Sequence, residues 1–236
     1  MNAVRIGLSG ASVMPWAGCG RPAQPFLSER AQQMPTLCRS PIPSDIPMPT
    51  HTVAQYQRRL LHRLQLRFGT DSVKQEWRAL EGVEATYGPR LDLAVGPFAS
   101  GQSKLHTEYK ALHEQHRAFI SELWSAHASN VGTIALQGQS PDALWNSNIN
   151  ARCFLAIEIE NCVSRKHLLG GALNASALGR IAVLVGWTRD KLDALLRLRS
   201  YFAFLASVGK PTFGTGNLLV LSPDQLAWAV GAERTA

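Results

Sequence analysis

The sequence predicts an α/β fold in which a central mixed β-sheet is flanked by helices, within a single domain at residues 51–236. Strand and helix patterns alternate through the second half of the chain, which is typical of parallel strands joined by right-handed helical crossovers. A hairpin pattern precedes them and would add antiparallel strands. The chain has 236 residues, of which 45% are hydrophobic, and this is enough for one domain with a sizeable core.

Residues 1–50 are predicted to form a disordered leader. They are rich in Pro, Ser, Gly and Gln and have little apolar periodicity. Four prolines between positions 41 and 49 oppose both a helix and a central strand. The first 20 residues contain Arg5 as their only cation and lack a clean apolar segment, which argues against a secretory signal.

The composition favours a cytoplasmic protein with reduced thiols and a polyanionic partner. No apolar run approaches the ~20 residues that a membrane-spanning helix needs. The four cysteines show no CxxC pairing, so neither a disulfide framework nor a zinc site is indicated. The net charge of +7 favours binding to a nucleic acid, provided that the charge is clustered.

An amphipathic helix is expected after Thr52, because apolar residues recur there at helical spacing as far as Phe68. Basic residues lie beside the apolar ones. This basic flank is interpreted either as a solvated face or as a surface that follows a phosphate backbone. Its arginines are Arg58, Arg59, Arg63 and Arg67.

A second short helix is expected after Ser72, with Val73 and Trp77 on its buried side, because Ser72 begins a capping-box pattern. Residues 83–95 then have the pattern of a β-hairpin, with alternating apolar residues on both sides of a Gly-Pro turn. Asp92 lies in the returning strand, on the face opposite to that strand's apolar residues. It is therefore either solvated or part of a site.

The longest helix is expected at residues 104–127. The two histidines that line its apolar side are interpreted as packing residues, because neither has a second ligand at i+4 spacing. Residues 129–150 are expected to be a loop around a short helical turn, with Ser140 as the N-cap and Pro141 at the first position. A connection of this length in a compact domain is often functional, and this one is interpreted as a substrate-side flap.

Six segments of alternating type follow, and each has a recognisable boundary. They are the strand 153–160, the helix between Ser164 and Gly179, the doubly buried strand 181–185, the helix that starts at Thr188, the strand 218–221, and a terminal helix capped by residues 222–225.

Charged side chains gather around the first of these strands. Because successive side chains of a strand alternate between its faces, Glu158 and Glu160 point to the same side. Arg165, Lys166 and His167 follow in the first turn of the next helix. Glu-x-Glu on a strand is ordinarily the solvated side of a sheet. Its coincidence with Asp92 favours a metal site instead, because clustered carboxylates repel one another unless a cation lies between them.

Carboxylates in such a site suit the metal-dependent hydrolysis of phosphodiesters. Mg²⁺, or Mn²⁺ in its place, takes hard oxygen ligands and usually one or two carboxylates. Glu160 is a candidate for the general base as well as for a ligand. Lys166 and Arg165, at a helix N-terminus, are candidates to hold the phosphate and stabilise the transition state. The candidate metal ligands are Asp92, Glu158, the backbone carbonyl of Ile159, and Glu160.

An acid in a hairpin strand, a later strand with a second acid, then a helix and a buried strand resemble the PD-(D/E)xK nuclease superfamily. The resemblance covers residues 80–190, with Asp92 as the first acid and Glu158 as the second. Glu160 stands where the family usually has lysine. Some members keep a glutamate there, others carry the lysine in the following helix, where Lys166 is the candidate, and others have lost catalysis.

This resemblance implies a restriction-endonuclease-like fold, cleavage of DNA with Mg²⁺ or Mn²⁺, and, in many members, a homodimer that cuts two strands. The alternative is a catalytically inactive module of the same fold that holds nucleic acid or a partner protein through the basic helix. A Rossmann-like nucleotide binder is less favoured, because no glycine pair lies between a strand and a helix. No pattern for a Ser or Cys nucleophile is present.

Overall fold

The computed structural model describes residues 52–79, 88–100, 104–132, 136, 140–162, 164–210 and 214–231. The leader predicted at residues 1–50 and the first arm of the hairpin predicted at residues 83–87 lie outside these ranges. Within them the chain forms seven α-helices and five strands, so the predicted α/β class is confirmed. None of the helices in this part of the chain is both long and apolar enough to cross a membrane.

The helices and strands alternate most regularly in the second half of the chain, as the sequence predicted. A short 3₁₀ turn, η1 (Thr70–Ser72), precedes the first strand. In chain order the elements are α1 (Val53–Phe68), β1 (Val73–Arg78), β2 (Arg90–Val95), α2 (His106–Gln115), α3 (Arg117–Asn130), α4 (Pro141–Asn146), β3 (Cys153–Glu160), α5 (Arg165–Leu178), β4 (Gly179–Gly186), α6 (Arg189–Ser207), β5 (Leu218–Leu221) and α7 (Pro223–Gly231).

The five strands form one mixed sheet in the order β1-β2-β3-β4-β5. β2 is antiparallel to both of its neighbours, whereas β3, β4 and β5 are parallel to one another. The parallel strands are joined by α5 and α6, as their alternation in the sequence predicted. The mixed sheet expected from the sequence is therefore confirmed.

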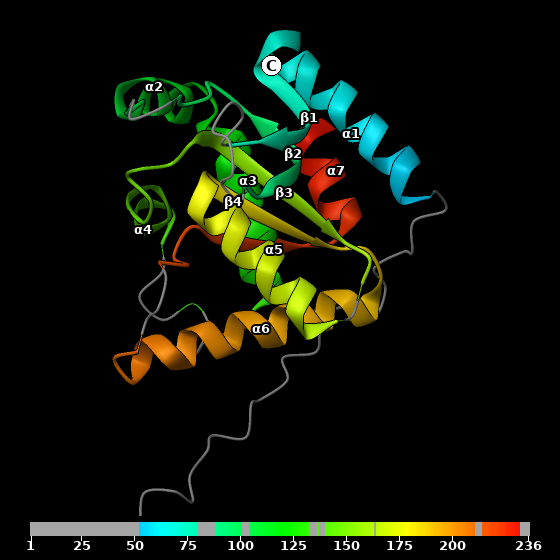
Figure 1. The fold of residues 1–236 in the computed structure, drawn as a ribbon, viewed down its shortest axis with the longest axis vertical. Helices are drawn as coiled ribbons and strands as arrows, with labels where there is room; N and C mark the ends of the chain where they lie inside the picture. The colour runs from blue at the N-terminus through cyan, green and yellow to red at the C-terminus, as the bar shows by residue number, and fades with distance from the viewer. Residues whose placement is uncertain are drawn as a thin grey trace, which may run out of the picture. The chain divides into compact units, whose positions relative to one another are not determined.

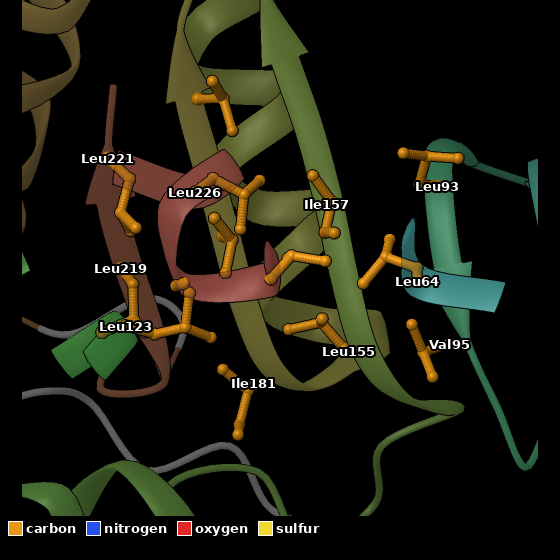
Figure 2. Packing of buried hydrophobic residues seen from close by; sticks show 14 of the residues in the cluster. Leu64, Leu93, Val95, Leu123, Leu155, Ile157, Ile181, Leu219, Leu221 and Leu226 are labelled. Atoms are coloured by element: carbon orange, nitrogen blue, oxygen red, sulfur yellow. The ribbon is translucent and has the colours of Figure 1, made fainter. Parts of the chain in front are cut away.

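Helices cover both faces of the sheet (Figure 1). On one face, α1, α3 and α7 pack over a core that Figure 2 shows from close by. There Leu64 lies beside the β3 residues Leu155 and Ile157, whereas Leu123 lies beside Leu219 of β5. On the other face, α5 and α6 pack over a second cluster that is rich in alanine. All eight residues of β4 are buried, which confirms the prediction of a strand covered on both sides.

The segment after Ser72 is strand β1 and not the predicted helix. It pairs with β2, so that Val73 lies opposite Val95 and Trp77 opposite Leu91. Both Val73 and Trp77 are buried, and a spacing of four residues fits a helix face and a strand face equally well. The apolar pattern was thus ambiguous, and pairing at the edge of the sheet decided between the two structures.

The alternation of faces is interrupted in both β1 and β2. Glu76 has a φ of 51°, and the side chains of Val73 and Trp77 enter different clusters. In β2, Leu93 and Val95 pack in the first cluster and Leu91 in the second, which corrects the expectation that its apolar residues share one face. The interruption in β2 falls at Asp92.

The single long helix predicted at residues 104–127 is two helices, α2 and α3, which meet at His116. His116 has φ −110° and ψ 24°, and its buried ring lies 4.4 Å from the Phe68 ring. The apolar spacing continues through this break, because both helices bury side chains against the same core. The apolar pattern of the sequence therefore does not reveal the break between α2 and α3.

His127 is buried, and its Nδ1 accepts a hydrogen bond from the Val220 N–H at 3.0 Å. This is a structural role.

The predicted N-cap hydrogen bonds are confirmed for two helices. For a third helix, only the position of the predicted N-cap residue is confirmed. Ser140 Oγ accepts a hydrogen bond from the Ala143 N–H at 3.0 Å at the start of α4. Ser222 and Gln225 bond reciprocally, side chain to backbone, at the start of α7. Ser164 precedes α5 but its side chain makes no capping hydrogen bond.

Candidate active site

A cleft lies where β2, β3 and the first half of α5 meet. It is open to solvent and has a volume of about 470 Å³. Both predicted glutamates of β3 line it, together with the Ile159 backbone between them. The polar side chains around it are those of Arg90, Glu158, Glu160, Asn161, His167 and Asn174.

β2 and β3 stop pairing at the edge of this cleft. Their last backbone pair is Leu93 with Ile157. At the next position Asp92 Oδ2 accepts a hydrogen bond from the Ile159 N–H at 2.7 Å. The Asp92 carboxylate thus takes the place of a lost backbone partner and satisfies the Ile159 N–H where the strands separate. The backbone of Asp92 also lowers the pKa of the Glu158 carboxyl, although other causes outweigh this effect.

The pKa values of all three carboxylates are raised. Burial is the largest cause for each of them, and the negative charges nearby add to it. The pKa of Glu158 is raised to about 9 by burial and by the charges of Asp92 and Glu160. The pKa values of Asp92 and Glu160 are also raised, in the case of Asp92 against the lowering effect of its hydrogen bond from Ile159. The cleft therefore favours neutral acids, or acids that face a cation.

Of the three nitrogen-bearing residues predicted near the acids, His167 lines the cleft. Its positive charge would lower the pKa of Glu160. Lys166 and Arg165 are exposed on the first turn of α5, outside the lining. The structure adds Arg90, which the sequence analysis missed and whose Nε lies 2.7 Å from Glu76 Oε2. Its position two residues before Asp92 was a usable signal, because such residues share a face of a regular strand.

The Glu160 carboxylate lies directly against the backbone of α5 at Gly171. A Cβ added to Gly171 would overlap Glu160 Oε1. Glycine inside a helix destabilises the helix by about 1 kcal/mol relative to alanine. The contact with Glu160 gives a physical reason for the glycine at position 171. Gly171 keeps the space that Glu160 occupies in the cleft.

The oxygen atoms of the cleft suit a hard cation, although they are not already arranged as a complete metal site. In the part of the chain that the structure describes, no group of three or more His, Cys, Asp or Glu side chains is arranged to hold a metal ion. Asp92, Glu158 and Glu160 therefore do not form a three-ligand centre as they stand. One or two carboxylates completed by water are the usual protein share of a Mg²⁺ site, and the raised pKa values show negative charge that a cation would offset.

The basic flank predicted on α1 is divided by the structure. Arg63 Nη1 donates to the Ala227 carbonyl at 3.0 Å, and Arg67 Nη2 donates to the Val230 carbonyl at 3.1 Å. These carbonyls belong to the last turns of α7, where a positive charge is favourable. Arg58 and Arg59 are exposed. Two of the four predicted nucleic-acid contacts therefore hold α1 to α7.

Comparison of the chain with protein-family models, with curated proteins and with solved structures finds no match in any of the three. A fold class by itself does not fix an activity, since one fold hosts many chemistries. The function is therefore inferred from the side chains that meet in the cleft.

Proposed function

We propose that the protein is a PD-(D/E)xK-like nuclease that hydrolyses phosphodiester bonds of DNA with Mg²⁺ or Mn²⁺ in this cleft. The observation that carries the proposal is the hydrogen bond by which Asp92 of β2 holds the Ile159 N–H, between the two glutamates of β3 that line the cleft. The order of the elements supports it. An acid-bearing strand, a second strand with Glu158, the helix α5 and the buried strand β4 follow one another as the resemblance implies.

Asp92, Glu158 and the backbone carbonyl of Ile159 would hold the metal, with Glu160 as a further ligand or as the general base. A bound Mg²⁺ supplies Lewis-acid polarisation of the phosphate and lowers the pKa of a water molecule. Glu160, whose pKa is raised, is a stronger base than an ordinary glutamate and is suited to accept a proton from that water. Gly171 keeps its carboxylate within the cleft.

Positive charge beside the phosphate is assigned to His167 and Arg90, because both line the cleft. They would compensate for the lysine that position 160 lacks, by binding the phosphate and offsetting the charge that develops on it. Lys166 and Arg165 precede His167 on the exposed surface of α5 and are candidates for contacts with flanking phosphates.

The test is cleavage of plasmid and single-stranded DNA with Mg²⁺ or Mn²⁺ by the full chain and three variants. Glu158→Gln and Asp92→Asn keep hydrogen-bonding side chains and remove one charge each. Glu108→Gln removes an exposed acid of α2 that does not line the cleft and serves as the matched control. Metal-dependent cutting that is lost in the first two variants and kept in the third supports the proposal. A folded wild type that does not cut under any of these conditions contradicts it.

A second candidate is a catalytically inactive module that holds nucleic acid or a partner protein. Glu160 in place of lysine favours it, as does the exposure of Arg58 and Arg59 on α1. It predicts salt-sensitive DNA binding that is unchanged in Glu158→Gln and lost in the double variant Arg58→Gln/Arg59→Gln. Arg63 and Arg67 are unsuitable for this test, because their replacement would also loosen α7.

A further inference from the structure

The last third of α6 carries a row of exposed apolar side chains. Tyr201, Phe204 and Val208 are 52%, 53% and 50% exposed. Their spacing of three and four residues places them along one side of the helix. Leu195 and Phe202 of the same helix are buried in the cluster against the sheet. The row therefore lies on the side of α6 that the core does not use.

Positive charge surrounds this row. Arg197 lies four residues before Tyr201, and Lys210 lies two residues after Val208; both are exposed. Arg199 lies on the buried side, is 4% exposed, and has a pKa that burial lowers to about 10. Its Nε has no hydrogen-bond partner in the described structure. Residues 194–210 contain no Asp or Glu. Asp193, one turn before Arg197, is paired with Arg189, whose Nε lies 3.2 Å from its Oδ1.

We propose that this row on α6 is a binding surface for single-stranded nucleic acid. Tyr201 and Phe204 offer rings on which bases can stack, and Arg197 and Lys210 offer contacts for the phosphates. Exposed aromatic rings next to a positively charged track are the combination by which proteins hold single strands without reading their sequence.

The positive charge of residues 194–210 favours single-stranded nucleic acid over a second copy of the chain as the molecule that binds this row. If two copies paired through the row, Arg197 and Lys210 of each copy would approach those of the other, with no acid in the segment to balance them. Nucleic acid brings negative phosphates together with flat apolar bases, so it complements both features of the surface.

The row lies toward the end of α6 that is far from the cleft. α6 follows β4, whose carboxyl end lies beside that of β3, and there the Trp187 N–H donates to the Glu160 carbonyl at 3.0 Å. At 1.5 Å per residue, Tyr201 is ~18 Å further along the helix axis than Arg189. The inference goes beyond the proposed cleavage, because binding at the row needs no metal and would remain if the cleft were catalytically silent.

The test measures binding of the full chain to a fluorescein-labelled oligothymidylate of about 15 nucleotides, by fluorescence anisotropy, in EDTA and at low salt. Tyr201→Ala and Phe204→Ala are each expected to raise the Kd at least about five-fold. Trp228→Ala is the matched control, since Trp228 is 74% exposed but lies on α7, on the opposite face of the sheet. It is expected to leave the Kd unchanged. Lys210→Gln is expected to reduce the salt dependence of binding.

An unchanged Kd in the folded double variant Tyr201→Ala/Phe204→Ala would overturn this inference. If that variant also changed from dimer to monomer in sedimentation, the row would be assigned to a second copy of the chain. Because the assay contains no divalent metal, its outcome is independent of whether Glu158→Gln loses cleavage.

Discussion

Asp92 of β2 accepts a hydrogen bond at 2.7 Å from the backbone N–H of Ile159, which lies between Glu158 and Glu160 on the neighbouring antiparallel strand β3. This relationship ties the candidate chemistry to the folding of the sheet. An apolar residue in place of Asp92 would leave the Ile159 N–H without its acceptor. Charge and hydrogen-bonding capacity must therefore be varied separately at Asp92.

The first prediction separates these two properties at Asp92. Asp92→Ala is expected to destabilise the protein by about 1–3 kcal/mol, because the Ile159 N–H loses its acceptor in a partly buried place. Asp92→Asn keeps an acceptor oxygen and removes a charge that raises the pKa of Glu158, so it is expected to be at least as stable as the wild type at pH 7. Urea unfolding measures both. Equal stabilities of the two variants would show that the hydrogen bond is not important.

The second prediction concerns pH. The ordinary pKa of Glu158 is 4.5 and its folded value is about 9, so between these values the folded state holds a proton that the unfolded state has lost. The contribution of Glu158 to stability in EDTA is therefore fully present below pH 4.5, falls as pH rises from 4.5 to about 9, and then levels. The slope for one proton reaches about 1.4 kcal/mol per pH unit. Glu158→Gln is expected to flatten the curve, and an equally steep curve in that variant would contradict the assignment.

The third prediction concerns the metal. A divalent cation that binds the ionised carboxylates of the folded state stabilises it by about 2.7 kcal/mol at a concentration of one hundred times its Kd. Mn²⁺ is expected to raise the Tm of the wild type and to leave the Tm of Glu158→Gln unchanged. Thermal unfolding with and without Mn²⁺ is the measurement. An equal increase in both proteins would place the binding elsewhere on the chain.

The fourth prediction uses two adjacent glycines of α5. A Cβ at Gly170 has no heavy atom within 4 Å, whereas a Cβ at Gly171 would overlap Glu160 Oε1. Gly170→Ala is expected to stabilise the protein by about 0.5–1 kcal/mol. Gly171→Ala is expected to lose that gain and to displace Glu160, which would reduce cleavage. If both variants behave alike in unfolding and cleavage assays, Gly171 has no special role.

The fold and the site differ in how far the sequence predicts them. Strand and helix boundaries from Cys153 onward are predicted well, because apolar runs there are bounded by clear caps and glycines. Strand β1 is not predicted, because the spacing of Val73 and Trp77 fits a helix as well as a strand. Pairing with a strand that is distant in the sequence decides between the two structures. The break at His116 leaves no mark on the apolar spacing. Such features depend on contacts between segments that are far apart in the chain.

The shared face of Glu158 and Glu160 could also be expected from strand periodicity, whereas the choice among the cations could not. Arg165, Lys166 and His167 are consecutive, and their order in the sequence does not tell which of them turns toward the cleft. Only the packing of α5 against β3, through Gly171, selects His167. Likewise, the basic residues of α1 are equivalent in the sequence, and α7 distinguishes Arg63 and Arg67 from the others.

The attachment of α1 to α7 has a consequence for the order in which the domain forms during synthesis. The Tyr56 hydroxyl donates to the Pro223 carbonyl across 167 positions of sequence, and Arg63 and Arg67 reach the same helix. While the ribosome is still making β4, α1 has emerged but its partner does not yet exist. The core under α1 is therefore completed only after α7 has been made, because these two helices are far apart in the sequence.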